Sequence, residues 1–163
     1  MPMQLRKANL KDIEFILKQE NRDEFINFVF QWSKEKHTQN LNDPDKQYFI
    51  IENNDTETKG YAIISGLTSL NSSIELTRII IAEPGKGYGK KALLLIIKKV
   101  FEEYKAHRLY LDAIEYNQRA IYVYQSLGFK EEGILRESVK RENSYDSLVL
   151  MSMLEDEYFQ IYK

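Results

Sequence analysis

The chain has 163 residues, 43% of them hydrophobic, and a formal net charge of -2. This length suits one sizeable core, so we expect a single domain over residues 1–163, and the nearly balanced charge excludes a whole-protein field that would attract nucleic acid or an anionic membrane. The sequence contains no cysteine, which excludes disulfides, a thiolate nucleophile and cysteine-ligated metal sites.

Two further features bear on location and on metals. The start of the chain has no apolar leader, and the longest apolar stretch, at 92–101, contains two lysines and is too short to span a bilayer. We therefore expect a soluble cytoplasmic protein with no membrane partner. The two histidines, His37 and His107, lack metal-ligand spacing, so we expect no metal and place both side chains at the surface.

The first part of the chain predicts a strand, a helix and then an aromatic segment. Residues 3–8 alternate apolar and polar side chains, which favours a strand, and Asn9 followed three residues later by an aspartate indicates the start of a helix over 10–20. The aromatic residues within 21–36 favour a second helix, although the pattern alone leaves a strand open. The polar segment at 37–46 predicts a loop.

The rest of the chain alternates strands with helices. A continuous apolar stripe from Leu93 to Tyr104 predicts an amphipathic helix after a glycine-containing turn, and a second helix, over 117–127, ends at Gly128. We expect strands at 48–52, 60–70, 73–82, 108–114, 129–139 and 145–153. The second and third of these are neighbouring antiparallel strands, and the whole predicts a mixed α/β sheet.

The turn at 84–90 is the first candidate site. An apolar strand runs into Gly85, Gly87 and Gly89 and then directly into the helix, which places unblocked backbone N–H groups at a helix N-terminus and predicts an anion site. Positive charge is added by Lys86, Lys90 and Lys91. A plain tight turn is the alternative interpretation. The residues fit neither a P-loop, which needs Ser or Thr after its lysine, nor the dinucleotide fingerprint, which opens a βαβ unit.

A second stretch, Asn117 to Phe129, has the pattern N-x-x-A-x-x-x-Y-x-x-x-G-F. Together with Gly87-Tyr88-Gly89, it resembles the GNAT superfamily of N-acetyltransferases, whose Gln/Arg-x-x-Gly-x-Gly/Ala turn holds the pyrophosphate of coenzyme A. Pro84 departs from that pattern, because it stands where the family has Gln or Arg. The resemblance covers nearly the whole chain, most strongly from Ser73 onward. It implies an α/β (α+β) fold, a GNAT-type mixed, mostly antiparallel sheet flanked by helices.

The resemblance also implies acetyl-CoA as cosubstrate and roles for the matching residues. Asn117 would contact the pantetheine arm or an adjacent backbone group, and the Tyr124 hydroxyl would donate a proton to the departing thiolate. A tyrosine pKa near 10 fits a donor at neutral pH, whereas plain packing on the helix is the alternative for Tyr124, and Tyr122 faces elsewhere. The expected CoA-binding residues are Ile80, Ile81, Ala82, Gly85, Lys86, Gly87, Tyr88, Gly89, Lys90, Asn117 and Tyr124.

Without a cysteine, direct attack of a neutral amine on the thioester is the simplest route, with backbone N–H groups near 79–82 stabilising the tetrahedral intermediate. An alkylammonium must first lose a proton, so a carboxylate is the natural base. Glu75 ranks first, ahead of Asp112 and Glu115, and each is also compatible with a solvated surface carboxylate. Arg78, on the same strand as Glu75, is a candidate ion-pair partner.

The early helices supply candidates for the acceptor side, where carboxylates would suit a cationic amine. They are Asp23, Glu24, Phe28 and Trp32, for which core aromatics under a solvated charged face are the alternative interpretation. The closing stretch at 128–154 resembles the bacterial branch that includes ribosomal-protein N-terminal acetyltransferases.

We therefore expect an acetyl-CoA-dependent N-acetyltransferase that acts on a primary amine of a protein or a small molecule. Two alternatives stay open: a non-catalytic acyl-CoA-binding or sensing module with the same fold, and a generic nucleotide-binding domain. For the assembly, a homodimer and a monomer both stay open.

Overall fold

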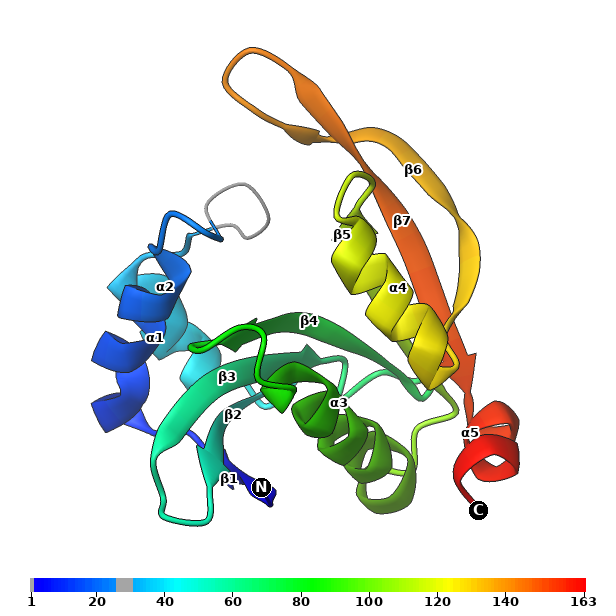
Figure 1. The fold of residues 1–163 in the computed structure, drawn as a ribbon, viewed down its shortest axis with the longest axis horizontal. Helices are drawn as coiled ribbons and strands as arrows, with labels where there is room; N and C mark the ends of the chain where they lie inside the picture. Colours follow the sequence, from blue (N-terminus) through cyan, green and yellow to red (C-terminus); the bar gives the residue numbers. More distant parts are fainter. Residues whose placement is uncertain (1, 26–30) are drawn as a thin grey trace.

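The computed structural model describes residues 2–25 and 31–163. Within these residues a seven-stranded sheet has the order β1-β2-β3-β4-β5-β7-β6 (Figure 1). Its strands are β1 (Met3–Lys7), β2 (Lys46–Asn53), β3 (Thr58–Ser65), β4 (Ser73–Ile81), β5 (Arg108–Ile114), β6 (Lys130–Lys140) and β7 (Tyr145–Leu154). Neighbouring strands pair antiparallel except for β4 and β5. The expected mixed, mostly antiparallel sheet is confirmed.

Helices cover both faces of this sheet. On one face, α1 (Ile13–Glu20) and α2 (Lys34–Leu41) lie over a core that includes Ile16, Tyr48 and Tyr61. On the other, the larger core contains side chains from α3 (Tyr88–Lys98), α4 (Gln118–Leu127) and α5 (Glu155–Tyr162). A π-helical turn, Lys99–Glu103, continues α3 and buries Val100 and Phe101 in the same core. The sheet therefore separates two cores.

Local helix signals are confirmed. The Asn9 side chain accepts a hydrogen bond from the N–H of Lys11, and the Asp12 carboxylate accepts one from the N–H of Asn9, which forms a capping arrangement before α1. Asn117 caps α4, and Gly128 ends it with φ of 110° in the left-handed region. The apolar stripe of α3 is buried as predicted.

Three predictions for the elements are wrong. The helix expected over 21–36 is absent from its described part before Ser33, where residues 21–25 form turns; the stretch 26–30 lies outside the described residues. The loop expected at 37–46 is instead largely occupied by α2, whose N-cap is Ser33. No element was expected after β7, yet α5 follows it directly. His37, expected at the surface, is fully buried, whereas His107 is exposed as predicted.

The two parallel strands separate soon after they pair. Register pairing between β4 and β5 covers only 73–75 and 108–110, and the next residues of β5 pair with β7 alone. One edge of β4 therefore opens beyond Glu75, and a strand edge without a neighbour presents backbone N–H and C=O groups to whatever lies beside it. This separation positions the candidate site.

Candidate active site

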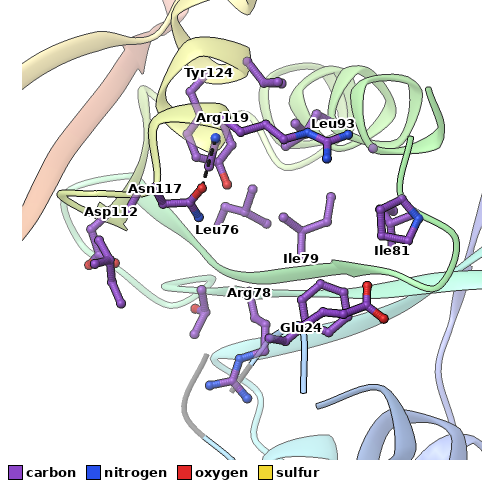
Figure 2. Close-up of a pocket in the computed structure, with 18 of the residues that line it drawn as sticks. Glu24, Leu76, Arg78, Ile79, Ile81, Leu93, Asp112, Asn117, Arg119 and Tyr124 are labelled. Carbon is purple, nitrogen blue, oxygen red and sulfur yellow. Dashed lines mark hydrogen bonds between the residues drawn. The ribbon is translucent and has the colours of Figure 1, made fainter. Parts of the chain in front are cut away.

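A cleft of about 670 Å³ lies where β4 and β5 separate. Its walls come from β4, the glycine turn, the first turn of α3, the end of β5 and one side of α4. Figure 2 shows Asn117 and Tyr124 on one side of β4, facing Leu76 and Ile79, and shows Arg78 and Glu24 on the opposite side. We name these two sides the donor end and the acceptor end.

The glycine turn forms one limit of the donor end. Gly85 and Gly87 have φ of 88° and 79°, a backbone conformation that side chains with a Cβ rarely adopt. Gly87 is the N-cap of α3, and a Cβ added at Gly85 or Gly87 would have no heavy atom within 4 Å. The space beside these two glycines, at the N-terminus of α3, is therefore open, which fits an anionic group such as the pyrophosphate of CoA.

Most of the expected CoA-binding residues line this cleft, but three do not. The residues that do are Ile81, Gly85, Gly87, Tyr88, Gly89, Lys90, Asn117 and Tyr124. Ile80 is buried in the core of the α1 face, and the N–H of Ala82 donates to the Lys59 carbonyl at 2.8 Å as part of the β3–β4 pairing. Lys86 is turned to an ion pair with Glu83 at 2.9 Å. These three residues are therefore not among those that line the cleft, and their contact with CoA stays a prediction.

Arg119 is a cleft residue that the sequence interpretation did not include. It lines the donor end together with Pro84 and the turn, and Figure 2 shows its side chain reaching from α4 toward Leu93 of α3. Helical spacing places Arg119 and Val123 on one face of α4, but the sequence alone did not mark that face as part of the cleft.

Tyr124 and Asn117 lie on the inner side of α4. Asn117 accepts a hydrogen bond from the Ala120 N–H at 3.3 Å, so its oxygen caps the helix and its amide nitrogen points into the cleft region (Figure 2). Desolvation, and then the charge of Asp112, raise the pKa of Tyr124 to about 12. The phenol is therefore protonated at neutral pH. Tyr122 is 72% exposed and is not among the residues that line the cleft.

Two of the three candidate bases line the cleft. Glu75 accepts a hydrogen bond from the Thr77 hydroxyl at 2.9 Å, and Asp112 stands on β5 across the gap. Although Asp112 is open to solvent, the protein around it and then the charge of Glu75 raise the pKa of its carboxyl. Glu115 is exposed and does not line the cleft.

The acceptor end rests on a buried polar cluster. Arg78 pairs with Glu20 at 2.5 Å rather than with Glu75, and both side chains are almost inaccessible to solvent. The Glu20 carboxylate also accepts a hydrogen bond from the Tyr61 hydroxyl at 2.6 Å. His37 Nε2 lies 2.8 Å from the same oxygen, an ion-pair distance, although its N–H does not meet hydrogen-bond alignment.

The cluster strongly favours an ionised Glu20. Burial alone would raise the pKa of this carboxyl, but the neighbouring His37 and Tyr61 and the charge of Arg78 outweigh burial and hold it below its ordinary value. Sequence reasoning missed Glu20 because a polar residue at the end of an amphipathic helix gives no sign of burial.

Of the four acceptor-side candidates, Glu24 and Trp32 line the cleft, and Phe25 joins them. Asp23 is exposed and does not line it, and Phe28 lies outside the described residues. In the part of the chain that the structure describes, no helix is long and apolar enough to cross a membrane. Nor do the residues at 2–25 and 31–163 include a group of His, Asp and Glu suited to a metal.

Comparison with known proteins places this geometry in a family. Residues 13–129 match the model of the acetyltransferase (GNAT) family. The spermidine N(1)-acetyltransferase of Vibrio cholerae is 24% identical over 94% of this chain and 94% of its own length. The spermine/spermidine N(1)-acetyltransferase of Bacillus subtilis is 43% identical over 67 residues, which are 40% of this chain and 44% of that protein.

Solved structures agree on the fold. The spermidine N-acetyltransferase of V. cholerae in complex with CoA and spermine superposes with a TM-score of 0.87 at 23% identity, over 96% of this chain and 98% of that one. These relatives are polyamine acetyltransferases, so the expected likeness to the ribosomal-protein branch is not supported, and a non-catalytic module is not favoured. The chain belongs to the acetyltransferase (GNAT) family and is an N-acetyltransferase that uses acetyl-CoA.

Proposed function

We propose that this enzyme, as one domain over residues 1–163, transfers an acetyl group from acetyl-CoA to a primary amine of a polyamine such as spermidine or spermine. One observation carries the proposal: the carboxylates of Glu24, Glu75 and Asp112 line the same cleft as the glycine turn. Several negative charges along one cleft suit an acceptor with several ammonium groups. The polyamine acetyltransferases among the relatives add support.

At the donor end, we assign the phosphate-binding role to backbone N–H groups of the turn at 85–90. Arg119 supplies the cation that the family's Gln/Arg position lacks here, because Pro84 stands at that position. A guanidinium is suited to a phosphate, which it contacts through two N–H groups at once. Arg119→Gln is expected to raise the KM for acetyl-CoA about fivefold, measured at saturating polyamine.

At the reaction centre, we assign the proton donor to Tyr124 and the base to Glu75 or Asp112. The open edge of β4 offers backbone N–H groups near Ile79 and Ile81, to which we assign the orientation of the thioester and the stabilisation of its developing negative charge. Either carboxylate takes a proton from the bound ammonium, directly or through water, and the neutral amine that results attacks the thioester carbon. The Tyr124 hydroxyl gives its proton to the leaving thiolate.

The test is release of free CoA thiol from acetyl-CoA with a panel of amines, followed by mass spectrometry of the product. We expect turnover with spermidine and spermine, weak turnover with a monoamine, and none with peptides that carry a free N-terminus. Preferred acetylation of the peptides would refute the polyamine assignment while leaving the family intact.

Self-association is a further part of the proposal. A solved V. cholerae spermidine N-acetyltransferase, similar with a TM-score of 0.84, is described as dodecameric. In this chain Ile134, Leu135 and Tyr145 are exposed on the hairpin of β6 and β7, which extends away from the sheet in Figure 1. We expect an oligomer by light scattering, and a monomer at all concentrations would contradict it.

A further inference from the structure

The acceptor end contains a cation that is poorly suited to a cationic substrate. Arg78 lines the cleft, and its guanidinium carbon lies 4.1 Å from the centre of the Trp32 ring, another cleft residue. The side chain of Arg78 is only 5% exposed, so solvent screens its charge weakly. A bare arginine at this place would repel an incoming ammonium group.

Glu20 supplies the compensating charge. Its Oε2 lies 2.5 Å from Arg78 Nη1, with both groups withdrawn from solvent. The Tyr61 hydroxyl donates a hydrogen bond to this carboxylate, and the His37 ring lies next to it. Both hold the carboxylate ionised and in place. Because Glu20 itself does not line the cleft, it can balance Arg78 without contacting the acceptor.

The same carboxylate fixes part of the cleft wall. Glu20 Oε1 accepts a hydrogen bond from the backbone N–H of Trp32 at 3.1 Å, and the ring of Trp32 packs edge-on against His37, with centroids 5.6 Å apart. The indole is therefore held from its backbone by Glu20 and from its face by Arg78. Glu20, Arg78 and Trp32 therefore form one unit, which gives the cleft the aromatic surface of Trp32 and little net charge.

We infer that Glu20 is a positioning and charge-balancing residue of the acceptor site. By neutralising Arg78, it leaves the carboxylates of Glu75 and Asp112 as the negative charge that a polycationic acceptor meets, whereas Glu24 pairs with Arg22 at 2.5 Å. This inference rests on the proposed polyamine activity. It implies a measurable signature, since loss of Glu20 penalises acceptors in proportion to their charge, whereas loss of packing penalises all acceptors alike.

The experiment compares hexylamine, putrescine and spermidine, with one, two and three ammonium groups, at saturating acetyl-CoA. For Glu20→Gln we expect the KM to rise about tenfold for spermidine and less than about twofold for hexylamine, with kcat within about twofold of wild type. The double variant Glu20→Gln with Arg78→Met removes both charges. It should restore the KM for spermidine to within about threefold of wild type.

A matched control is available in Glu52, a buried carboxylate that pairs with Arg6 at 3.0 Å and does not line the cleft. Glu52→Gln also removes the charge of a buried, ion-paired carboxylate, although its partner Arg6 is more exposed, and it should leave the ratio of KM values for spermidine and hexylamine unchanged. If Glu20→Gln fails to fold, Arg78→Met alone tests the same point. Removal of the cation should then lower the KM for spermidine relative to hexylamine about threefold.

The outcomes separate the two levels of the proposal. A wild-type enzyme that acetylates no polyamine would refute the polyamine function and this inference together. A wild-type enzyme that acetylates spermidine, beside a Glu20→Gln variant whose KM changes equally for all three amines, would refute the inference alone. Failure of the double variant to recover spermidine relative to hexylamine would also refute it.

Discussion

The donor and acceptor ends of the cleft are built in different ways. The donor end comes from two continuous segments, 84–90 and 117–129, whose turn and caps depend on neighbours a few residues away. The acceptor end depends on Glu20 and Arg78, which are 58 positions apart. Turns and helix caps depend on nearby residues and can be predicted from a sequence, whereas an ion pair between distant residues cannot. The chemistry common to a family can therefore be identified before the substrate is.

The sharpest test of the donor end is Tyr124→Phe. Loss of the hydroxyl removes the proposed proton donor while the ring still packs near Phe129, with centroids 5.9 Å apart. We expect kcat to fall about 100-fold or more, with the KM for acetyl-CoA little changed, in steady-state assays. Tyr122→Phe, on the exposed side of the same helix, is the matched control and should retain wild-type kcat. Equal activity of the two variants would contradict the assignment.

The glycine turn gives the next largest effect. Gly87→Val places a branched side chain at φ of 79° and over the proposed phosphate position, so we expect the KM for acetyl-CoA to rise about 30-fold. Lys86→Ala should change it less than about twofold, because that lysine pairs with Glu83 instead of lining the cleft. Steady-state assays with varied acetyl-CoA at saturating polyamine provide the measurement. A comparable rise of this KM in the two variants would contradict phosphate binding by the backbone N–H groups of the turn.

The same contrast explains which elements could be predicted. Strand β4 and the helix α3 carry buried apolar side chains at their own period, and Gly128 marks the end of α4 by its left-handed backbone. Helix α2 lacks such a stripe, because its buried residues are the polar His37 and Asn40. Its N-cap, Ser33, was the signal available.

The missed helix α5 also had a local signal. Three acidic residues, Glu155, Asp156 and Glu157, occupy its first turn, where negative charge favours a helix. Its buried side is formed by a single residue, Tyr158, so no periodic stripe accompanied the acids. At the acceptor end, the pairing of Arg78 with Glu20 could not be predicted, because Glu75 stood closer in the sequence and offered the same charge.

Substitution of the two candidate bases should have a smaller effect, which distinguishes the base from the carboxylate that only binds the acceptor. Glu75→Gln and Asp112→Asn keep the size of each side chain, and the variant that removes the base should lower kcat/KM about tenfold at neutral pH. We expect the loss for that variant to shrink as pH rises and the amine loses its proton unaided. The other variant should mainly raise the KM for spermidine. Full activity in both would exclude these carboxylates as the base.

The smallest expected effect is on Tm, and it should have opposite signs for Asp112, at the reaction centre, and Glu20, in the buried cluster. The pKa of Asp112 is raised above its ordinary 3.8, so the folded protein holds this proton more tightly than the unfolded chain does. Its ionised form therefore costs stability above the raised pKa, and the cost disappears as pH falls below both values. Asp112→Asn should therefore raise Tm slightly near pH 8, because solvent screens much of the cost at this exposed side chain, and by progressively less toward about pH 4.

The contrasting variant is Glu20→Gln. Because the folded pKa of Glu20 is lowered, its stabilising contribution is present above the unfolded value of 4.5 and is lost as pH falls through the folded pKa. Glu20→Gln should therefore lower Tm near pH 8, which is the opposite sign to Asp112→Asn. In acid, the Tm of each variant should approach that of the wild type. Scanning calorimetry across this pH range measures both. A loss of Tm in Asp112→Asn near pH 8 would show that ionised Asp112 stabilises the fold, which would contradict a raised pKa for this carboxyl.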